Sequence, residues 1–149
     1  MELSYGKPER QTQMSDPAPA LVVIYVQDVV RVAAFYRDTL SRPIVSQEAG
    51  FAVVGDAALE VAVVRMHEAL AVANPLETPP RVRAETPLKP SFLVDDLVRV
   101  AAAAAAAGGG TKPSDAAWRW RGQLHLDGHD PEGNPLQFRV RDGGTCSEK

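Results

Sequence analysis

The sequence predicts an α+β protein in which two tandem βαβββ modules form a half-barrel cup of mixed sheet, with the helices on the outside. Residues 26–34 recur as residues 94–102, at an offset of 68 with no gap, and seven of the nine positions are identical. Each copy follows a short run of strand-forming residues and leads into apolar residues at helical spacing. Alternating segments after each helix complete the two modules, so the chain is an internal duplication.

The first module is expected to begin with a strand over Leu21 to Val26, in which the even-numbered residues are all apolar. Asp28 occupies the N-cap position of a helix from about Val29 to Leu40, because its carboxylate can accept from unpaired backbone N–H groups. Arg42-Pro43 ends this helix, since the residue before a proline disfavours the helical conformation. The later strands are predicted at Ile44 to Gln47, Phe51 to Val54 and Leu59 to Val64.

The second module starts at about Lys89, and its strand parity matches the first because the offset is even. Asp96 caps an alanine-rich helix that runs to Ala107 and is closed by glycines. Alternation from Trp118 to Asp127 predicts one strand, and the last strand is predicted at Pro135 to Arg141.

A proline-rich linker separates the modules, and its only regular structure is expected to be a short helix at His67 to Ala73. Polar residues without periodicity flank the modules at both ends and are expected to be disordered or loose. The predicted organisation is an N-terminal extension (1–18), a single domain (19–142) made of a first module (about 19–66), a linker (67–88) and a second module (about 89–142), and a flexible tail (143–149).

The composition excludes several classes of protein. A net charge of -3 and a pI near 5.6 argue against a nucleic-acid-binding surface. No apolar run reaches the length that spans a membrane, and the N-terminus lacks the apolar segment of a signal peptide. The single cysteine, Cys146, lies in the polar tail, so a disulfide framework is excluded and a reducing compartment is favoured. We expect a cytoplasmic protein with no nucleic-acid or membrane partner.

Three groups of residues form a recognisable pattern. The first is Tyr25-Val26-x-Asp28 leading into Phe35-Tyr36-Arg37-Asp38-x-Leu40. The second is Val94-Asp95-Asp96-Leu97 before the alanine helix, and the third is Asp130-Pro131-Glu132-Gly133-Asn134-Pro135-Leu136. Together they resemble the vicinal oxygen chelate superfamily of glyoxalase I, bleomycin-resistance proteins and extradiol dioxygenases. The resemblance implies this fold and a homodimer, but no particular reaction.

The resemblance also implies four metal-ligand positions in the cup, which fall at Leu21, Glu60, Lys89 and Gln137. Leucine offers no lone pair, a protonated lysine repels a divalent cation, and glutamine is a weak neutral ligand. A catalytic ion normally takes three protein ligands, so we expect neither a metal nor another cofactor.

The histidines do not supply a replacement metal site. His125 and His129 are four residues apart, which is roughly 13 Å along a strand and too far to share one ion. His67 lies in the linker. The parity of His125 aims it into the cup beside Gln123 and Asp127, where it is placed to donate a proton or to contact a ligand.

Glu60 is unusual because it is a charged residue inside an otherwise apolar strand. Our hypothesis is that Glu60 and Lys89 form an ion pair where the metal of the related enzymes would sit. The alternative is that Lys89 extends to solvent and that Glu60 pairs with the backbone or with Arg139.

Aromatic residues near the cup indicate a binding surface for a flat ligand. Trp118 and Trp120 precede the penultimate strand, and one of them is expected to contact the ligand while the other packs in the core or at an interface. The full set of expected ligand contacts is Tyr25, Glu60, Lys89, Ser91, Trp118, Trp120, His125, Gln137 and Arg139.

The favoured function is binding of a small organic molecule without a metal, resembling the branch of the superfamily that sequesters antibiotics. An alternative is a lyase or isomerase-like enzyme in which Glu60, buried among apolar neighbours, is the general base. A third possibility is an interaction module with no ligand. The polar groups of the cup weigh against this third possibility, because unused buried charge is costly.

Overall fold

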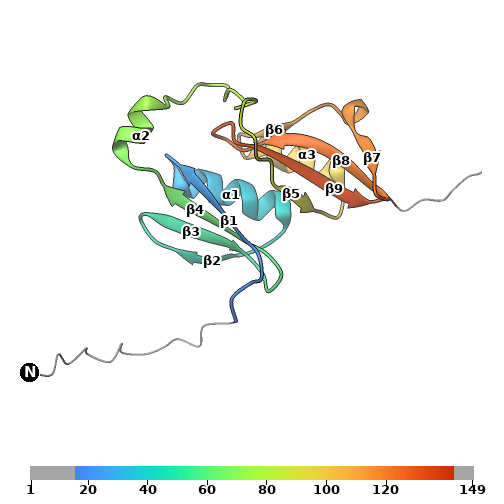
Figure 1. Cartoon of the computed structure of the whole chain (residues 1–149), viewed down its shortest axis with the longest axis horizontal. Helices are drawn as coiled ribbons and strands as arrows, with labels where there is room; N and C mark the ends of the chain where they lie inside the picture. The colour runs from blue at the N-terminus through green and yellow to red at the C-terminus, as the bar shows by residue number, and fades with distance from the viewer. Residues whose placement is uncertain (1–15, 143–149) are drawn as a thin grey trace, which may run out of the picture.

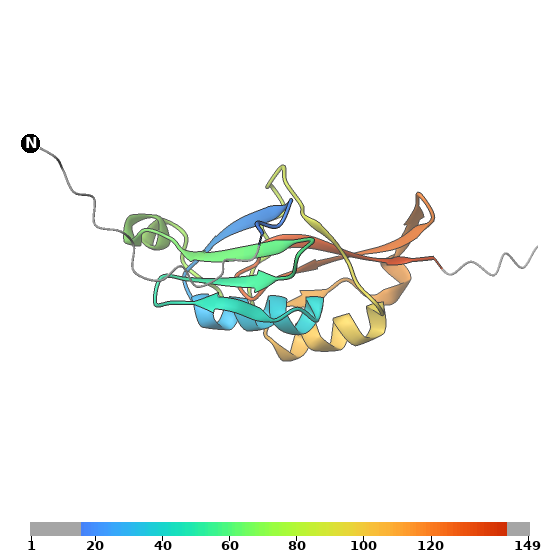
Figure 2. The ribbon, with the colours of Figure 1, turned by 90° about the horizontal axis from the view of Figure 1, so that it is seen from below.

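The structure, a computed structural model, describes residues 16–142 (Figure 1). The tail and most of the predicted N-terminal extension lie outside the described residues, as does Cys146. Two sheets lie side by side, and the two long helices cover the same face of both (Figure 2). Neither sheet closes into a barrel, and the predicted α+β class with two βαβββ modules is confirmed.

The N-terminal sheet has four strands in the order β1-β4-β3-β2. β1 runs parallel to β4, whereas the other neighbours are antiparallel, so the sheet is mixed. Each element lies within one residue of its predicted bounds. The elements are β1 (Leu21–Val26), α1 (Val29–Leu40), β2 (Ile44–Gln47), β3 (Phe51–Gly55) and β4 (Glu60–Arg65).

The C-terminal sheet has the order β5-β9-β8-β6, and β7 also pairs with β8. Its first strand again runs parallel to its last. The linker contains the short helix α2 (Glu68–Ala73), as predicted, and then runs without regular structure to the second module. That module contains β5 (Ser91–Leu93), α3 (Leu97–Ala106), β6 (Gly110–Thr111), a 3₁₀ turn (Ser114–Ala116), β7 (Trp118–Trp120), β8 (Gln123–His129) and β9 (Pro135–Arg141).

The prediction of one strand from Trp118 to Asp127 is wrong. Arg121 and Gly122 both adopt positive φ, at 51° and 69°, and fold the segment into a hairpin. Two central residues with positive φ match the twist of a tight hairpin, and glycine adopts this conformation readily. The turn places Trp118 opposite His125 and Trp120 opposite Gln123.

The duplicated caps form as predicted. The Asp28 carboxylate accepts from Arg31 N at 3.0 Å, and Asp96 Oδ1 accepts from Val98 N at 2.7 Å and from Arg99 N at 3.0 Å. These bonds satisfy backbone donors that the first helical turn leaves unpaired, so each Asp fixes where its helix begins.

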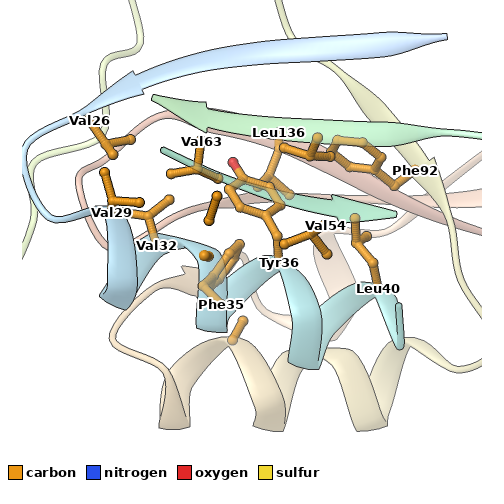
Figure 3. Close-up of a cluster of buried hydrophobic side chains, with 14 of the residues drawn as sticks. Val26, Val29, Val32, Phe35, Tyr36, Leu40, Val54, Val63, Phe92 and Leu136 are labelled. Carbon is orange, nitrogen blue, oxygen red and sulfur yellow. The ribbon is translucent and has the colours of Figure 1, made fainter. Parts of the chain in front are cut away.

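One apolar core joins the two modules beneath the sheets. Phe35 and Tyr36 of α1 are fully buried and meet side chains from both modules (Figure 3). The ring centroids of Tyr36 and Phe92 are 6.1 Å apart in an edge-on arrangement, which is favourable for aromatic pairs. The modules therefore share one core.

The turn between β8 and β9 also fastens the modules together. Glu132 is almost completely buried, and its carboxylate accepts from Gln27 N at 2.8 Å and from Asp28 N at 2.8 Å. Asp130 accepts from the Tyr36 hydroxyl at 3.1 Å, and burial raises the pKa of both groups. This motif therefore has a structural role, because it connects the end of the second module to the start of α1.

Across residues 16–142, no helix is long and apolar enough to cross a membrane.

Candidate functional site

The open face of the C-terminal sheet is the face turned away from α3. The even-numbered residues Phe92, Leu126 and Phe138 are buried in the core, so the odd-numbered side chains of β5, β8 and β9 project from the opposite face. β7 adds its two tryptophans to this face through the hairpin.

A chain of hydrogen bonds crosses this open face. Lys89 Nζ donates to Asp127 Oδ1 at 2.9 Å, and Gln137 Nε2 donates to the same oxygen at 3.3 Å. Gln137 Oε1 accepts from Ser91 Oγ at 2.8 Å and lies 2.9 Å from His125 Nδ1. The structure thus connects four of the predicted site residues: Gln137 joins Ser91 and His125, and Asp127 joins Gln137 to Lys89.

Asp127 determines the orientation of the Gln137 amide. A carboxylate only accepts hydrogen bonds, so the amide nitrogen faces Asp127 and the amide oxygen faces His125. His125 Nδ1 therefore carries a proton. His125 Nε2 lies 3.2 Å from the Trp120 carbonyl oxygen, and the side chain is only 2% exposed. Because His125 is buried between the Gln137 amide and the Trp120 carbonyl oxygen, it acts as a support for neighbouring groups.

The two tryptophans form an exposed aromatic wall on this support. The Trp118 ring stacks on His125 with centroids 4.4 Å apart and an angle of 10° between the planes. The Trp120 ring is tilted over the same histidine at 5.9 Å, and Arg121 Cζ lies 5.4 Å from the Trp120 ring centroid. Trp118 is 42% and Trp120 57% exposed, so neither packs in the core of the single chain, and packing of one of them at an interface stays a prediction.

The predicted Glu60–Lys89 ion pair does not form within the chain, because Lys89 pairs with Asp127 instead. Arg139 is not the partner of Glu60 either, since its Nη1 donates to Gln123 Oε1 at 3.1 Å. Among residues 16–142 we find no hydrogen bond or ion pair to the Glu60 carboxylate. The sequence contained one indication of the true partner of Lys89: Asp127 follows His125 by two positions in β8, so both side chains project from the same face of the sheet.

The open face of the N-terminal sheet is mostly apolar, with Glu60 next to Leu21 at one end of it. Leu21, Val23 and Tyr25 of β1 are about half exposed, and Glu60, the first residue of the central strand β4, is partly buried in a pocket with Asp56. Tyr25 and Lys89 share the lining of a 440 Å³ cavity between β1 and the end of the linker. The structure therefore places Tyr25 beside the polar chain of the C-terminal sheet and leaves Glu60 in a different pocket.

The four positions that correspond to metal ligands do not fit a cation. The Leu21 side chain has no atom that can coordinate a metal, and the Lys89 ammonium group is positively charged and paired with Asp127. Gln137 Oε1 already accepts from two hydrogen-bond donors. Within the described part of the chain, no group of three or more His, Cys, Asp or Glu residues is arranged to hold a metal.

Several solved structures with this arrangement of modules are described as glyoxalase-related or resistance proteins. A glyoxalase/bleomycin resistance protein/dioxygenase family enzyme from Burkholderia phytofirmans PsJN is similar at a TM-score of 0.59 and 19% identity, covering 81% of this chain and 96% of that chain. The fosfomycin resistance protein FosX from Mesorhizobium loti is similar at a TM-score of 0.56 and 14% identity, covering 90% and 97% of the two chains. A glyoxalase-related enzyme from Fulvimarina pelagi is similar at a TM-score of 0.56 and 16% identity, covering 81% and 86%. At these identities the likeness shows the fold alone.

The sequence itself identifies the family. The family described as Glyoxalase-like domain matches residues 21–139, which is most of the chain. The protein therefore belongs to the glyoxalase-like domain family of the vicinal oxygen chelate superfamily. A comparison with curated proteins gives no match.

Proposed function

We propose that this protein binds a small organic molecule with an aromatic part on the open face of the C-terminal sheet, without a metal ion. The exposed pair of indoles, Trp118 and Trp120, carries this proposal. Two large aromatic rings exposed on a hairpin beside a partly buried polar network are typical of a ligand-binding surface.

The physical basis is apolar contact combined with a few fixed polar groups. Stacking on Trp118 supplies affinity, and the His125–Gln137–Asp127 chain holds the wall in position before the ligand arrives. A preformed wall lowers the entropic cost of binding. Sequestration of the ligand requires no bond to be made or broken, and the misfit of the four ligand positions supports a metal-independent mechanism.

We do not assign the role of general base to Glu60. A general base needs a position within hydrogen-bond reach of the proton that it removes. Glu60 lies in a pocket with Asp56 and Val45, apart from the aromatic wall. The fosfomycin resistance protein among the structural neighbours is a reason to include antibiotics among the test ligands.

We further propose a homodimer in which a second copy covers the apolar open face of the N-terminal sheet. Leu21, Val23 and Tyr25 are 55%, 48% and 58% exposed on neighbouring positions of one strand face. A row of exposed apolar side chains on a sheet face is typical of a protein interface.

Tryptophan fluorescence tests the binding proposal directly, because both tryptophans of the chain lie in the wall. Saturable quenching by members of an aromatic library that includes antibiotics is the expected result. Trp118→Leu and Trp120→Leu each leave one reporter and should weaken binding at least about tenfold. Phe51→Leu, in the other sheet, is the matched control and should bind normally. Absence of quenching across a broad library would overturn the proposal.

Metal analysis of the purified protein tests the second half of the proposal. We expect no stoichiometric Zn, Ni, Mn or Fe, and unchanged quenching after treatment with a chelator. Stoichiometric metal whose removal abolishes ligand binding would contradict a metal-independent site.

A further inference from the structure

A second cavity lies on the same open face, at the end of β8 away from the tryptophans. Its volume is 550 Å³, and the linker segment from Val82 to Lys89 forms one wall. The opposite wall comes from β6, the end of β8 and the start of β9. The lining residues with polar side chains are Thr86, Lys89, Thr111, Lys112, Asp127 and His129.

The linker wall is attached to the folded domain. Arg83 N donates to Gly133 O at 2.9 Å, in the turn between β8 and β9. Gly133 has a φ of 81°, and a Cβ atom there would collide with the Arg81 carbonyl oxygen. Only glycine allows this close approach, so the turn fixes the path of the linker over the sheet.

The charges that line this cavity are unbalanced. Lys89 Nζ is 2.9 Å from Asp127 Oδ1, and Lys112 Nζ is 3.9 Å from Asp127 Oδ2. One carboxylate therefore faces two ammonium groups, and the Lys112 ammonium is beyond hydrogen-bond distance of it. His129 adds no charge at neutral pH, because burial lowers its pKa. The cavity carries one excess positive charge.

We infer that this cavity binds an oxyanion group, a carboxylate, sulfonate or phosphate, between Lys89 and Lys112. Ammonium groups and hydroxyl groups, here Thr86 and Thr111, are the donors that such anions accept from. The positively charged end thus complements the aromatic end of the face.

The spacing of the two ends defines a class of ligand, and this step rests on the proposed function. Asp127 follows His125 by two positions on β8, so the lysines and the stacked Trp118 are separated by roughly 7 Å along the strand. An aromatic ring that carries an anionic group near one end spans this distance. The preferred ligand is therefore an aromatic acid rather than a neutral or cationic aromatic compound.

A matched pair of probes tests the inference by tryptophan fluorescence. 2-Naphthoate and 2-naphthalenemethanol share a ring system and differ in charge. We expect the wild-type protein to bind the acid at least about fivefold tighter, and the difference to shrink with added salt. Lys112→Gln should remove most of the difference and leave the affinity for the alcohol unchanged. Arg65→Gln, a charge loss on the other sheet, should leave both affinities unchanged.

Titration with inorganic phosphate tests the anion site by a measurement that does not depend on the tryptophans. The chain has four lysines, so NMR of labelled lysine side chains can resolve Lys89 and Lys112. Saturable shifts of these two signals on addition of phosphate, absent in Lys112→Gln, would support the anion site. If these shifts occur but no aromatic probe binds, only the proposed function fails. Equal affinity for acid and alcohol, with no saturable phosphate shifts, would overturn the anion site and leave the aromatic wall intact.

Discussion

The two sheets share the same strand pairing but differ in the chemistry of their open faces. The offset of 68 and the pairing registers give most positions of β5, β9 and β8 of the C-terminal sheet a counterpart in β1, β4 or β3 of the N-terminal sheet. Four polar residues on the first correspond to apolar residues on the second, whereas Glu60 on the second corresponds to Pro135 on the first. The pairs are Ser91 and Val23, Gln137 and Ala62, Asp127 and Val53, and His125 and Phe51.

This difference shows how a duplicated fold separates stability from function. The buried sides of both modules contribute to one core, so each must keep apolar residues in the same places. The open faces are free of that constraint. One carries a hydrogen-bonded network with an aromatic wall, and the other is mostly apolar, which is why we propose that a second copy covers it.

The largest expected effect comes from breaking the connection between the two halves. Glu132→Ala leaves the partly buried backbone N–H groups of Gln27 and Asp28 without their acceptor, and losing both charge-assisted hydrogen bonds is costly. We expect the free energy of unfolding to fall by about 3 kcal/mol, as measured by urea denaturation. Glu132→Gln should cost roughly half as much, because one oxygen remains. A loss of less than about 1 kcal/mol would show that the turn does not join the modules.

A smaller effect is expected when the polar network itself is broken. Gln137→Leu removes the acceptor for His125 and Ser91 and should lower the free energy of unfolding by about 2 kcal/mol. Ala62→Ser, at the counterpart position, should change it by no more than about 0.5 kcal/mol. Urea denaturation of both variants makes the comparison, and similar losses at the two positions would contradict the asymmetry between the faces.

A third prediction concerns dimerisation through the exposed apolar residues of β1. Val23→Lys introduces a charge in the middle of the exposed row and should weaken dimerisation at least about tenfold, because burying an unpaired charge is unfavourable. Analytical ultracentrifugation measures the dissociation constant, and circular dichroism checks that the fold is retained. A wild-type protein that remains monomeric at high concentration would refute the proposed dimer.

The smallest effect concerns protonation of Asp127. Burial acts to raise the pKa of Asp127, but hydrogen bonds from Lys89 and Gln137 outweigh it and hold this pKa below its usual value. The lowered pKa contributes stability above the pKa of the unfolded chain, near 3.9, and this contribution is lost as the pH falls through the folded pKa. Lys89→Met should raise the pKa of Asp127 in an NMR titration, with at most about 1 kcal/mol of stability involved. An unchanged pKa would mean that the ion pair does not form in solution.

The sequence predicted most of the helices and strands, because these elements are determined by residues close to one another along the chain. The caps at Asp28 and Asp96 and the parity of the strands depend on neighbouring residues only. The hairpin at Arg121-Gly122 was missed for two reasons. Arginine is not a typical residue at positive φ, and the alternation of apolar and polar residues along the sequence continues through the turn without interruption. The site was predicted as a set of residues on one face, without their correct partners.

By itself, the sequence determined that two βαβββ modules form and, outside the hairpin of the two tryptophans, which side chains lie on each face, since periodicity fixes both. The tertiary structure alone decided that Lys89 meets Asp127 rather than Glu60, that Glu132 holds the start of α1, and that the linker closes a cavity over β8. These contacts join residues far apart along the chain. They depend on how two sheets and a linker pack around one core, which no local pattern encodes.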